Sequence, residues 1–305
     1  MATDQPALVF DRAFSPVVGA SEPVADGIAR VTAPNASDYT FTGTNSFIVG
    51  DQTVFLVDAG PDDPAHLEAL VAAVGKRRVE AVLLTHTHKD HSAGARAAAA
   101  RFSAPVWFAG QHRRSRPLRP FETDPLARAC DWTLVPDRVL SDGEVLDAGG
   151  MAIEVITTPG HCANHIAFGI AGTPYLLSGD HVMGWNSTLV AVPDGSMRDY
   201  LASLDKLVIR DFATYLPAHG GPVADGPGQA RALARHRGRR NDQIVEFASH
   251  GPKTMRDLLE AIYPGMPGRS RFAARLTLAA HVEYLAEVQG LRRRFGLRGW
   301  EVVAG

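Results

Sequence analysis

Thr85-His86-Thr87-His88-Lys89-Asp90-His91 places four side chains that can bind a metal ion within six residues. The segment follows an apolar run, residues 79–84, which predicts a buried strand. The spacing His-x-His-x-Asp-His cannot direct all four side chains one way on a regular strand or helix, so it indicates a loop that wraps around metal. His86 and His88 can converge on one ion, and Asp90 and His91 then face a second. Imidazoles with carboxylates are typical ligands of Zn²⁺.

Three later segments place a His or an Asp directly after a predicted strand and beside a glycine. They are Pro159-Gly160-His161, Gly179-Asp180-His181 and Pro217-Ala218-His219-Gly220. Loops that follow strands often meet at one edge of a layered fold and carry its active site. We therefore expect these side chains to complete a site for two metal ions.

Apolar runs and their spacing predict an α/β chain with a helical end. Strands are predicted at residues 46–50, 54–58, 79–84, 106–108, 144–146, 153–156, 166–170, 175–179 and 212–217, with a turn at Gly149-Gly150, and helices at 62–75, 94–100 and 197–210. The Gly- and Pro-rich residues 221–228 predict a boundary between a catalytic domain, 1–227, and a C-terminal domain, 228–305. Helices at 230–249, 254–262 and 272–288, then a hairpin of 291–295 and 300–303 around 296–299, follow the order of a winged helix.

These motifs, in this order, resemble the metallo-beta-lactamase superfamily, whose diagnostic HxHxDH is His86 to His91 here. The resemblance covers about Leu8 to Val223 and implies a four-layer αββα sandwich with two Zn²⁺ ions at one edge. It implies one metal held by His86, His88 and His161, another held by Asp90, His91 and His219, and Asp180 bridging them. Other divalent transition metals remain open.

The resemblance also implies a mechanism. A hydroxide bridging two metals is a nucleophile at neutral pH, and Asp90 is the candidate catalytic residue that orients it and accepts its proton. Asp58 resembles a buried Asp that braces the ligand loop.

A narrower resemblance, to the beta-lactamase-like protein two group, covers the whole chain. Residues 179–185 and 193–204 carry it, together with the helical tail. Animal members of the group are endoribonucleases on single-stranded RNA, and fungal relatives are thioesterases acting on acyl carrier protein. We therefore expect a hydrolase of a small ester, thioester or lactone, with a metal-dependent endoribonuclease as the alternative. A non-catalytic scaffold is a third reading, and the intact ligand set argues against it.

Several polar side chains near the motifs have two readings. His165 and His181 could donate a proton to a leaving group or could hydrogen-bond within the site. Cys162 could bind metal, although the ligand set is complete without it. His66, His112, His236, His250 and His281 are expected to have ordinary structural roles.

Composition and charge bound the remaining choices. The 305 residues are 45% hydrophobic and 21% charged, which excludes wholesale disorder. Two cysteines, no signal-like N-terminus and no apolar run of about 20 residues predict a cytoplasmic protein that does not enter a membrane. Residues 228–305 carry 14 basic and 7 acidic side chains, against 17 and 26 in the rest. The basic tail could bind nucleic acid, pack on the acidic domain or form a dimer contact, and the oligomeric state stays open.

Overall fold

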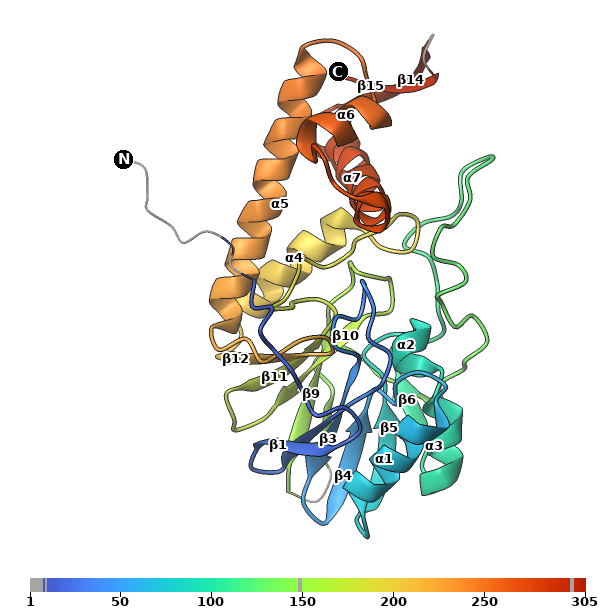
Figure 1. Cartoon of the computed structure of the whole chain (residues 1–305), viewed down its shortest axis with the longest axis vertical. Coiled ribbons are helices and arrows are strands. Elements are labelled where there is room, and N and C mark those ends of the chain that lie inside the picture. Colours follow the sequence, from blue (N-terminus) through green and yellow to red (C-terminus); the bar gives the residue numbers. More distant parts are fainter. Residues whose placement is uncertain (1–7, 9, 148–149, 297–298) are drawn as a thin grey trace.

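Two β-sheets pack face to face between two layers of helices (Figure 1). The computed structural model describes residues 8, 10–147, 150–296 and 299–305. The seven-stranded sheet has the order β1-β2-β3-β4-β5-β6-β7, with β1 Ser21–Ala25, β2 Ile28–Thr32, β3 Asn45–Gly50, β4 Thr53–Val57, β5 Arg78–Leu83, β6 Val106–Phe108 and β7 Arg138–Val139. The five-stranded sheet has the order β12-β11-β10-β9-β8, with β8 Val145–Asp147, β9 Ala152–Thr157, β10 Ile166–Ile170, β11 Tyr175–Gly179 and β12 Thr214–Pro217.

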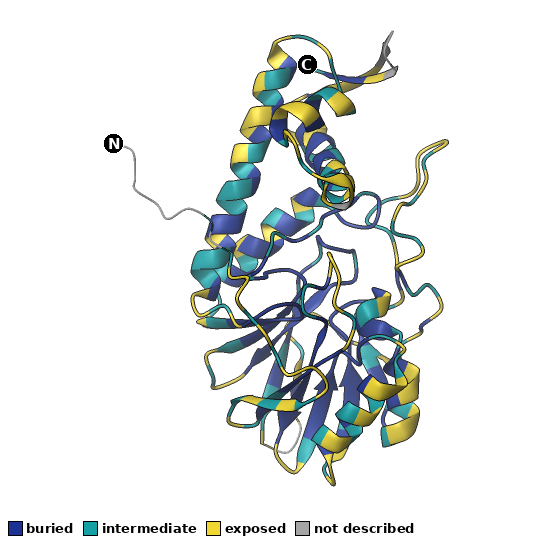
Figure 2. Ribbon diagram, viewed as in Figure 1, coloured by how far each residue is buried: buried dark blue, intermediate teal, exposed yellow. Residues whose placement is uncertain are grey.

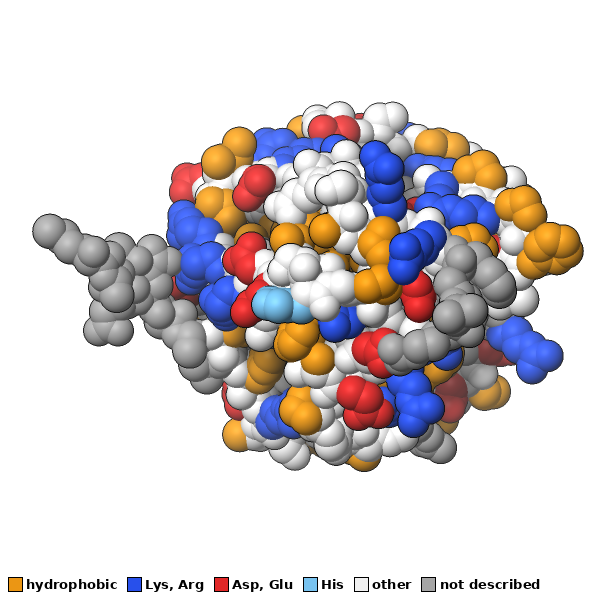
Figure 3. Space-filling model, turned by 90° about the horizontal axis from the view of Figure 1, so that it is seen from above, with side chains coloured by type: hydrophobic (Ala, Val, Ile, Leu, Met, Phe, Trp, Pro, Cys, Tyr) orange, Lys and Arg blue, Asp and Glu red, His pale blue; other side chains and the backbone are white. Residues whose placement is uncertain are grey.

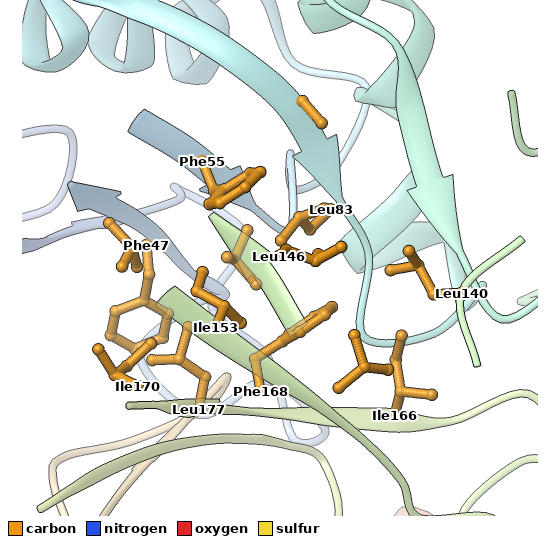
Figure 4. Packing of buried hydrophobic residues seen from close by; sticks show 14 of the residues in the cluster. Phe47, Phe55, Leu83, Leu140, Leu146, Ile153, Ile166, Phe168, Ile170 and Leu177 are labelled. Carbon is orange, nitrogen blue, oxygen red and sulfur yellow. The ribbon is translucent and has the colours of Figure 1, made fainter. Parts of the chain in front are cut away.

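The main core lies between the two sheets. Phe47, Phe55 and Leu83 from the first sheet face Ile153 and Phe168 from the second, and all five side chains are buried (Figure 4). Because side chains alternate between the faces of a strand, the remaining apolar residues of the same strands point outward and need a second cover.

Helices supply that cover on both outer faces. α1 (Pro64–Val74) and α3 (Ala95–Phe102) pack on the seven-stranded sheet, while α4 (Met197–Val208) and the start of α5 (Gly226–Ser249) pack on the other. The four-layer αββα sandwich expected from the sequence is therefore confirmed. α1 begins where the Asp63 side chain accepts hydrogen bonds from two backbone N–H groups, and it ends at Gly75 with φ 64°.

Some elements were not expected from the sequence. β1 and β2 were missed because SEPVA and IARVT lack a continuous apolar run. The segment 85–91, which carries four of the predicted metal ligands, overlaps a short helix, α2 (Lys89–Ser92), where we expected only a loop. Parts of the two predicted turns, Gly149 and residues 297–298, lie outside the described residues.

The C-terminal part has its own small core above the sandwich. It contains α6 (Met255–Ile262), α7 (Gly268–Val288) and a three-stranded sheet of order β13-β15-β14, formed by Lys253–Thr254, Gly299–Val303 and Arg292–Gly296. α5 belongs to both cores, since Ala230 and Leu233 pack with α4 whereas Ile244 and Ala248 pack with α6 and α7. The buried stripe along α5 is visible in Figure 2. Within the described residues, none of the helices could cross a membrane.

Ion pairs join residues 1–227 to the tail, 228–305. Their charges are the opposite of what the net charges of these two regions suggested. Arg116 pairs with Glu283 at 2.9 Å, Arg119 reaches the same carboxylate at 3.2 Å, and Arg198 pairs with Glu287 at 2.8 Å. In each pair the arginine comes from the residues before 228 and the glutamate from the tail. Seen from above, the basic side chains form several separate groups among acidic and apolar ones (Figure 3). The tail's excess of arginine is therefore not used in these contacts.

Candidate metal centre

Three imidazole nitrogens meet at the ends of β5 and β9. Nε2 of His86 lies 3.0 Å from Nδ1 of His88, and Nε2 of His161 lies 2.8 Å from the same atom. His86 and His88 belong to the loop after β5, and His161 follows β9. These are the three side chains that the resemblance assigns to one ion, and the fold brings them together.

The remaining four candidates gather beside the first three. Oδ2 of Asp90 lies 3.4 Å from Nε2 of His91 and 3.3 Å from Nε2 of His219. Asp180 stands between the two groups, with Oδ1 3.3 Å from His219 and Oδ2 3.6 Å from both His91 and His161. α2 produces part of this arrangement, because Asp90 and His91 both belong to this short helix and their side chains lie close together.

Each of the five histidines is held by a hydrogen bond through its other ring nitrogen. The acceptors are Thr85 Oγ1 for His86 at 3.0 Å, Asp194 Oδ2 for His88 at 2.8 Å, Asp58 Oδ2 for His91 at 2.9 Å, Leu189 O for His161 at 2.7 Å and Gly43 O for His219 at 3.2 Å. Thr85 can accept from His86 because its own hydroxyl donates to Asp58. We assign the ring protons to the outer nitrogens, which leaves each inner nitrogen with a lone pair.

This donor set fits divalent metal ions. Lone pairs of His86, His88 and His161 face one another at 2.8–3.0 Å in a buried place, a contact that repels unless a cation lies between them. Metal-binding imidazoles in proteins carry this kind of outer hydrogen bond, which fixes the tautomer.

Neighbouring charges shift the pKa values of these rings in opposite directions. Burial lowers the pKa of His219, but the charge of Asp180 outweighs it and raises that pKa to about 9. The pKa of His161 falls to about 4 through burial and the neighbouring His88. A metal ion bound at His219 would displace the proton that this raised pKa favours.

Two buried carboxylates, Asp58 and Asp194, form hydrogen bonds with the outer ring nitrogens of His91 and His88. Asp58, as expected, holds the loop: it accepts from the Thr85 N–H at 2.7 Å and from the Thr85 hydroxyl at 2.7 Å as well as from His91. Asp194 was not expected to have a role, although it lies in the segment 193–204 that carries the narrower resemblance. It binds His88, and His112 lies 3.1 Å from its other oxygen, so His112 is part of this support.

The three contested side chains lie beside the ligands. His165 bonds Thr158 Oγ1 at 2.8 Å through Nδ1 and accepts the Asp180 N–H at 3.1 Å through Nε2, so both of its nitrogens are engaged. His181 is buried against Tyr200, and burial lowers its pKa to about 3. The Cys162 thiol lies 3.4 Å from Asn164 Oδ1, and burial raises its pKa well above the usual value.

The centre opens into a cavity of about 670 Å³. His88, Asp90, His161, Asp180 and His219 line its floor. The opposite wall comes from α7 and the segment before it, and includes Tyr263, Met266, Phe272, Ala273, Ala274 and Thr277. Trp185, which stacks on Phe41 with ring centroids 5.0 Å apart, lines a side wall. The tail therefore roofs the metal centre.

The model of the metallo-beta-lactamase superfamily matches residues 39–219, the part of the chain that holds this centre. The chain belongs to the metallo-beta-lactamase superfamily. This metallo-beta-lactamase superfamily member is accordingly a hydrolase by class.

Curated relatives and solved structures extend the similarity into the tail. The beta-lactamase-like protein 2 homolog of Caenorhabditis elegans is 25% identical over 258 residues, covering 83% of this chain and 82% of its own. An atrochrysone carboxyl ACP thioesterase of Aspergillus chevalieri is 25% identical, covering 79% of this chain and 74% of its own.

A metallo-beta-lactamase family protein from Thermus thermophilus superposes with a TM-score of 0.74 at 26% identity, covering 93% of this superfamily member and 100% of its own chain. A beta-lactamase domain protein from Burkholderia ambifaria gives a TM-score of 0.80 at 21% identity, covering 98% and 97%. The latter likeness concerns the fold alone.

Proposed function

We propose that this protein is a hydrolase that uses two Zn²⁺ ions to cleave a small thioester, ester or lactone. The observation that carries the proposal is the set of five histidines whose outer nitrogens are all hydrogen-bonded and whose inner nitrogens converge. His86, His88 and His161 would hold one ion, Asp90, His91 and His219 the other, and Asp180 would bridge them. When bound, such ions supply an activated hydroxide at neutral pH and polarise the oxygen of the scissile group.

The chain's own residues supply orientation and proton transfer. The Asp90 side chain is 30% exposed and lines the cavity, whereas the histidines beside it are almost fully buried. It is therefore the carboxylate best placed to orient the attacking oxygen and accept its proton. Asp58 and Asp194 keep His91 and His88 in the required tautomer. The roof covers part of the cavity above the candidate metal centre.

The lining of the cavity supports an acyl substrate over RNA. Met266, Phe272, Ala273 and Ala274 offer an apolar surface opposite the metal centre. The exposed arginines 292–294 of β14 are not among the described residues that line the cavity. The thioesterase name of several fungal relatives supports a thioester in particular.

Two further expectations stand as part of the proposal. The order α5-β13-α6-α7-β14-β15 supports a winged-helix-like C-terminal domain beginning near residue 228, although α5 itself starts at Gly226. The two cysteines are free and buried, which supports a cytoplasmic location.

The test compares acyl substrates and RNA on one metal-loaded sample. We expect about two metal ions per chain, hydrolysis of simple thioesters or esters, and a loss of at least about a hundredfold in kcat/KM in His86→Ala and Asp180→Ala. His250→Ala, an exposed histidine at the end of α5, should match the wild type. Cleavage of labelled single-stranded RNA with no acyl hydrolysis would overturn the proposal in favour of the endoribonuclease. A protein that binds no metal would overturn both.

A further inference from the structure

Arg237 is the one arginine of the cluster 235–240 that the fold buries. Only 2% of its surface is exposed, whereas Arg239 is exposed and Arg235 and Arg240 are partly so. It projects from α5 and lines the same cavity as the metal centre. A buried guanidinium is costly unless its charge and its five N–H donors are satisfied.

The partners of Arg237 within the protein are neutral. Its Nη2 donates to the backbone oxygen of Thr188, and its guanidinium carbon lies 5.4 Å from the centre of the Tyr200 ring. Nε has no hydrogen-bond partner, and no carboxylate among the described residues forms an ion pair with this arginine. The charge is therefore not neutralised by the described part of the chain.

Arg237 shares its neighbourhood with a second guanidinium group, that of Arg240. His281 and His236 lie close enough that, after burial, the charges of Arg237 and Arg240 lower the pKa of both, that of His236 to about 4. Both rings are thus kept neutral beside a cluster of guanidinium groups. The charges acting on both rings at this wall are therefore those of guanidinium groups.

The backbone that holds Arg237 also holds two of the proposed metal ligands. The Thr188 hydroxyl donates to the backbone oxygen of Asp180 at 2.8 Å, and the next residue, Leu189, accepts from His161 at 2.7 Å. The guanidinium is thereby fixed relative to the metal centre. It can serve as a second anchor at a set distance from the reacting bond.

We propose that Arg237 binds a carboxylate of the substrate, so that the hydrolysed molecule is an acyl compound that carries a carboxylate away from the scissile bond. The planar fork of a guanidinium matches a carboxylate and can bind it through two hydrogen bonds. The apolar side chains of the roof contact the part of the acyl chain between the two ends. The inference rests on the proposed function, because it names the class of its substrate.

The first experiment compares two thioesters of equal length. The N-acetylcysteamine thioester of glutaric acid keeps one free carboxylate, and that of pentanoic acid has a methyl group there. We expect the wild type to prefer the glutaryl thioester in kcat/KM, and Arg237→Gln to reduce that preference at least about tenfold. Arg237→Lys should retain part of it, because it keeps the charge but loses the fork. Arg239→Gln, two residues along the same helix, should keep the full preference.

A binding measurement separates this inference from the proposed function. Glutarate is titrated calorimetrically into the metal-loaded wild type, Arg237→Gln and Arg239→Gln, with circular dichroism and metal content checked for each. We expect Arg237→Gln alone to bind at least about tenfold more weakly. Equal glutarate affinity in all three would overturn the assignment, even if thioesters are hydrolysed. If no thioester is hydrolysed, the proposed function fails, while weaker glutarate binding in Arg237→Gln alone still supports the anion site.

Inorganic phosphate, titrated in the same way, tests the choice of anion. We expect glutarate to bind more tightly than phosphate, and the reverse order would overturn the carboxylate assignment. Should Arg237→Gln fail to fold, Arg237→Lys carries the test. If Arg237→Lys then shows the glutarate affinity and the thioester preference of the wild type, the proposed binding of the carboxylate by the planar guanidinium is wrong.

Discussion

Replacing Asp58 with Asn should weaken the proposed metal site, because it should move the ring proton of His91 from Nδ1 to Nε2. The Asp58 carboxylate accepts three hydrogen bonds, from the Thr85 N–H, the Thr85 hydroxyl and His91 Nδ1. An amide has one oxygen. With that oxygen on the Thr85 N–H, its NH₂ group faces His91 Nδ1, which must then accept. The ring proton moves to Nε2, the atom that points at Asp90 and Asp180.

The magnitude follows from the same contacts. A lost outer partner of a metal-binding histidine costs about 10- to 100-fold in metal affinity, or about 1.4–2.8 kcal/mol. Without metal, the lost hydrogen bonds to a charged group should cost about 1.5–3 kcal/mol of unfolding free energy. Backbone strain should add nothing, since Asp58 has φ 56° and Asn readily adopts that conformation.

Competition with a chromophoric Zn²⁺ chelator measures the first effect, and urea unfolding in the presence of a chelator measures the second. Asp63→Asn is the matched control, because the amide oxygen can still cap α1 and the site is untouched. A dissociation constant for Zn²⁺ within about twofold of the wild type would refute the assigned tautomer of His91.

Three further outcomes are expected. Asp194→Asn should weaken the ion held with His88 by a similar 10- to 100-fold, and unchanged affinity at both sites would contradict the brace. Gly179→Ala should lower the unfolding free energy by roughly 2–4 kcal/mol, because Gly179 has φ 53° and a Cβ would lie 2.5 Å from His165 Nε2; a loss below about 0.5 kcal/mol in urea would contradict this. Burial lowers the pKa of His66 to about 4, so the unfolded chain binds a proton below pH 6.5 that the folded chain does not. The metal-free protein should therefore lose about 2 kcal/mol between pH 7 and 5 that His66→Gln does not lose, and parallel urea profiles for the two would disprove it.

Local patterns in the sequence anticipated most of the sandwich. α1 could be predicted because its apolar spacing, its acidic start and Gly75 all act within one segment. β5 and the segment His86 to His91 could likewise be predicted, because the apolar run and the spacing of the histidines lie within one continuous stretch. β1 and β2 were missed since their burial depends on β3, which pairs with β2, rather than on their own composition.

Contacts between distant segments could not be predicted in this way. Asp194 binds His88 across 106 residues, and no spacing rule relates the two. The cluster of arginines at 235–240 indicated a basic surface, yet which member turns inward depends on how α5 lies over the 188–189 loop. The charge balance of the two parts likewise misled us about the polarity of the ion pairs between them.

The shared helix α5 has a consequence for how the cavity is used. At 24 residues it is about 36 Å long, and it runs without interruption from the core that it shares with α4 to the core that it shares with α6 and α7. The distance between the two sides of the cavity is therefore set by a continuous α-helix and not by an irregular segment. A substrate that enters finds roof and floor already aligned, so little of its binding energy is spent on bringing them together. By the same token the tail cannot be cut away as a module, because the cut would remove Ala230 and Leu233 from the core of the sandwich.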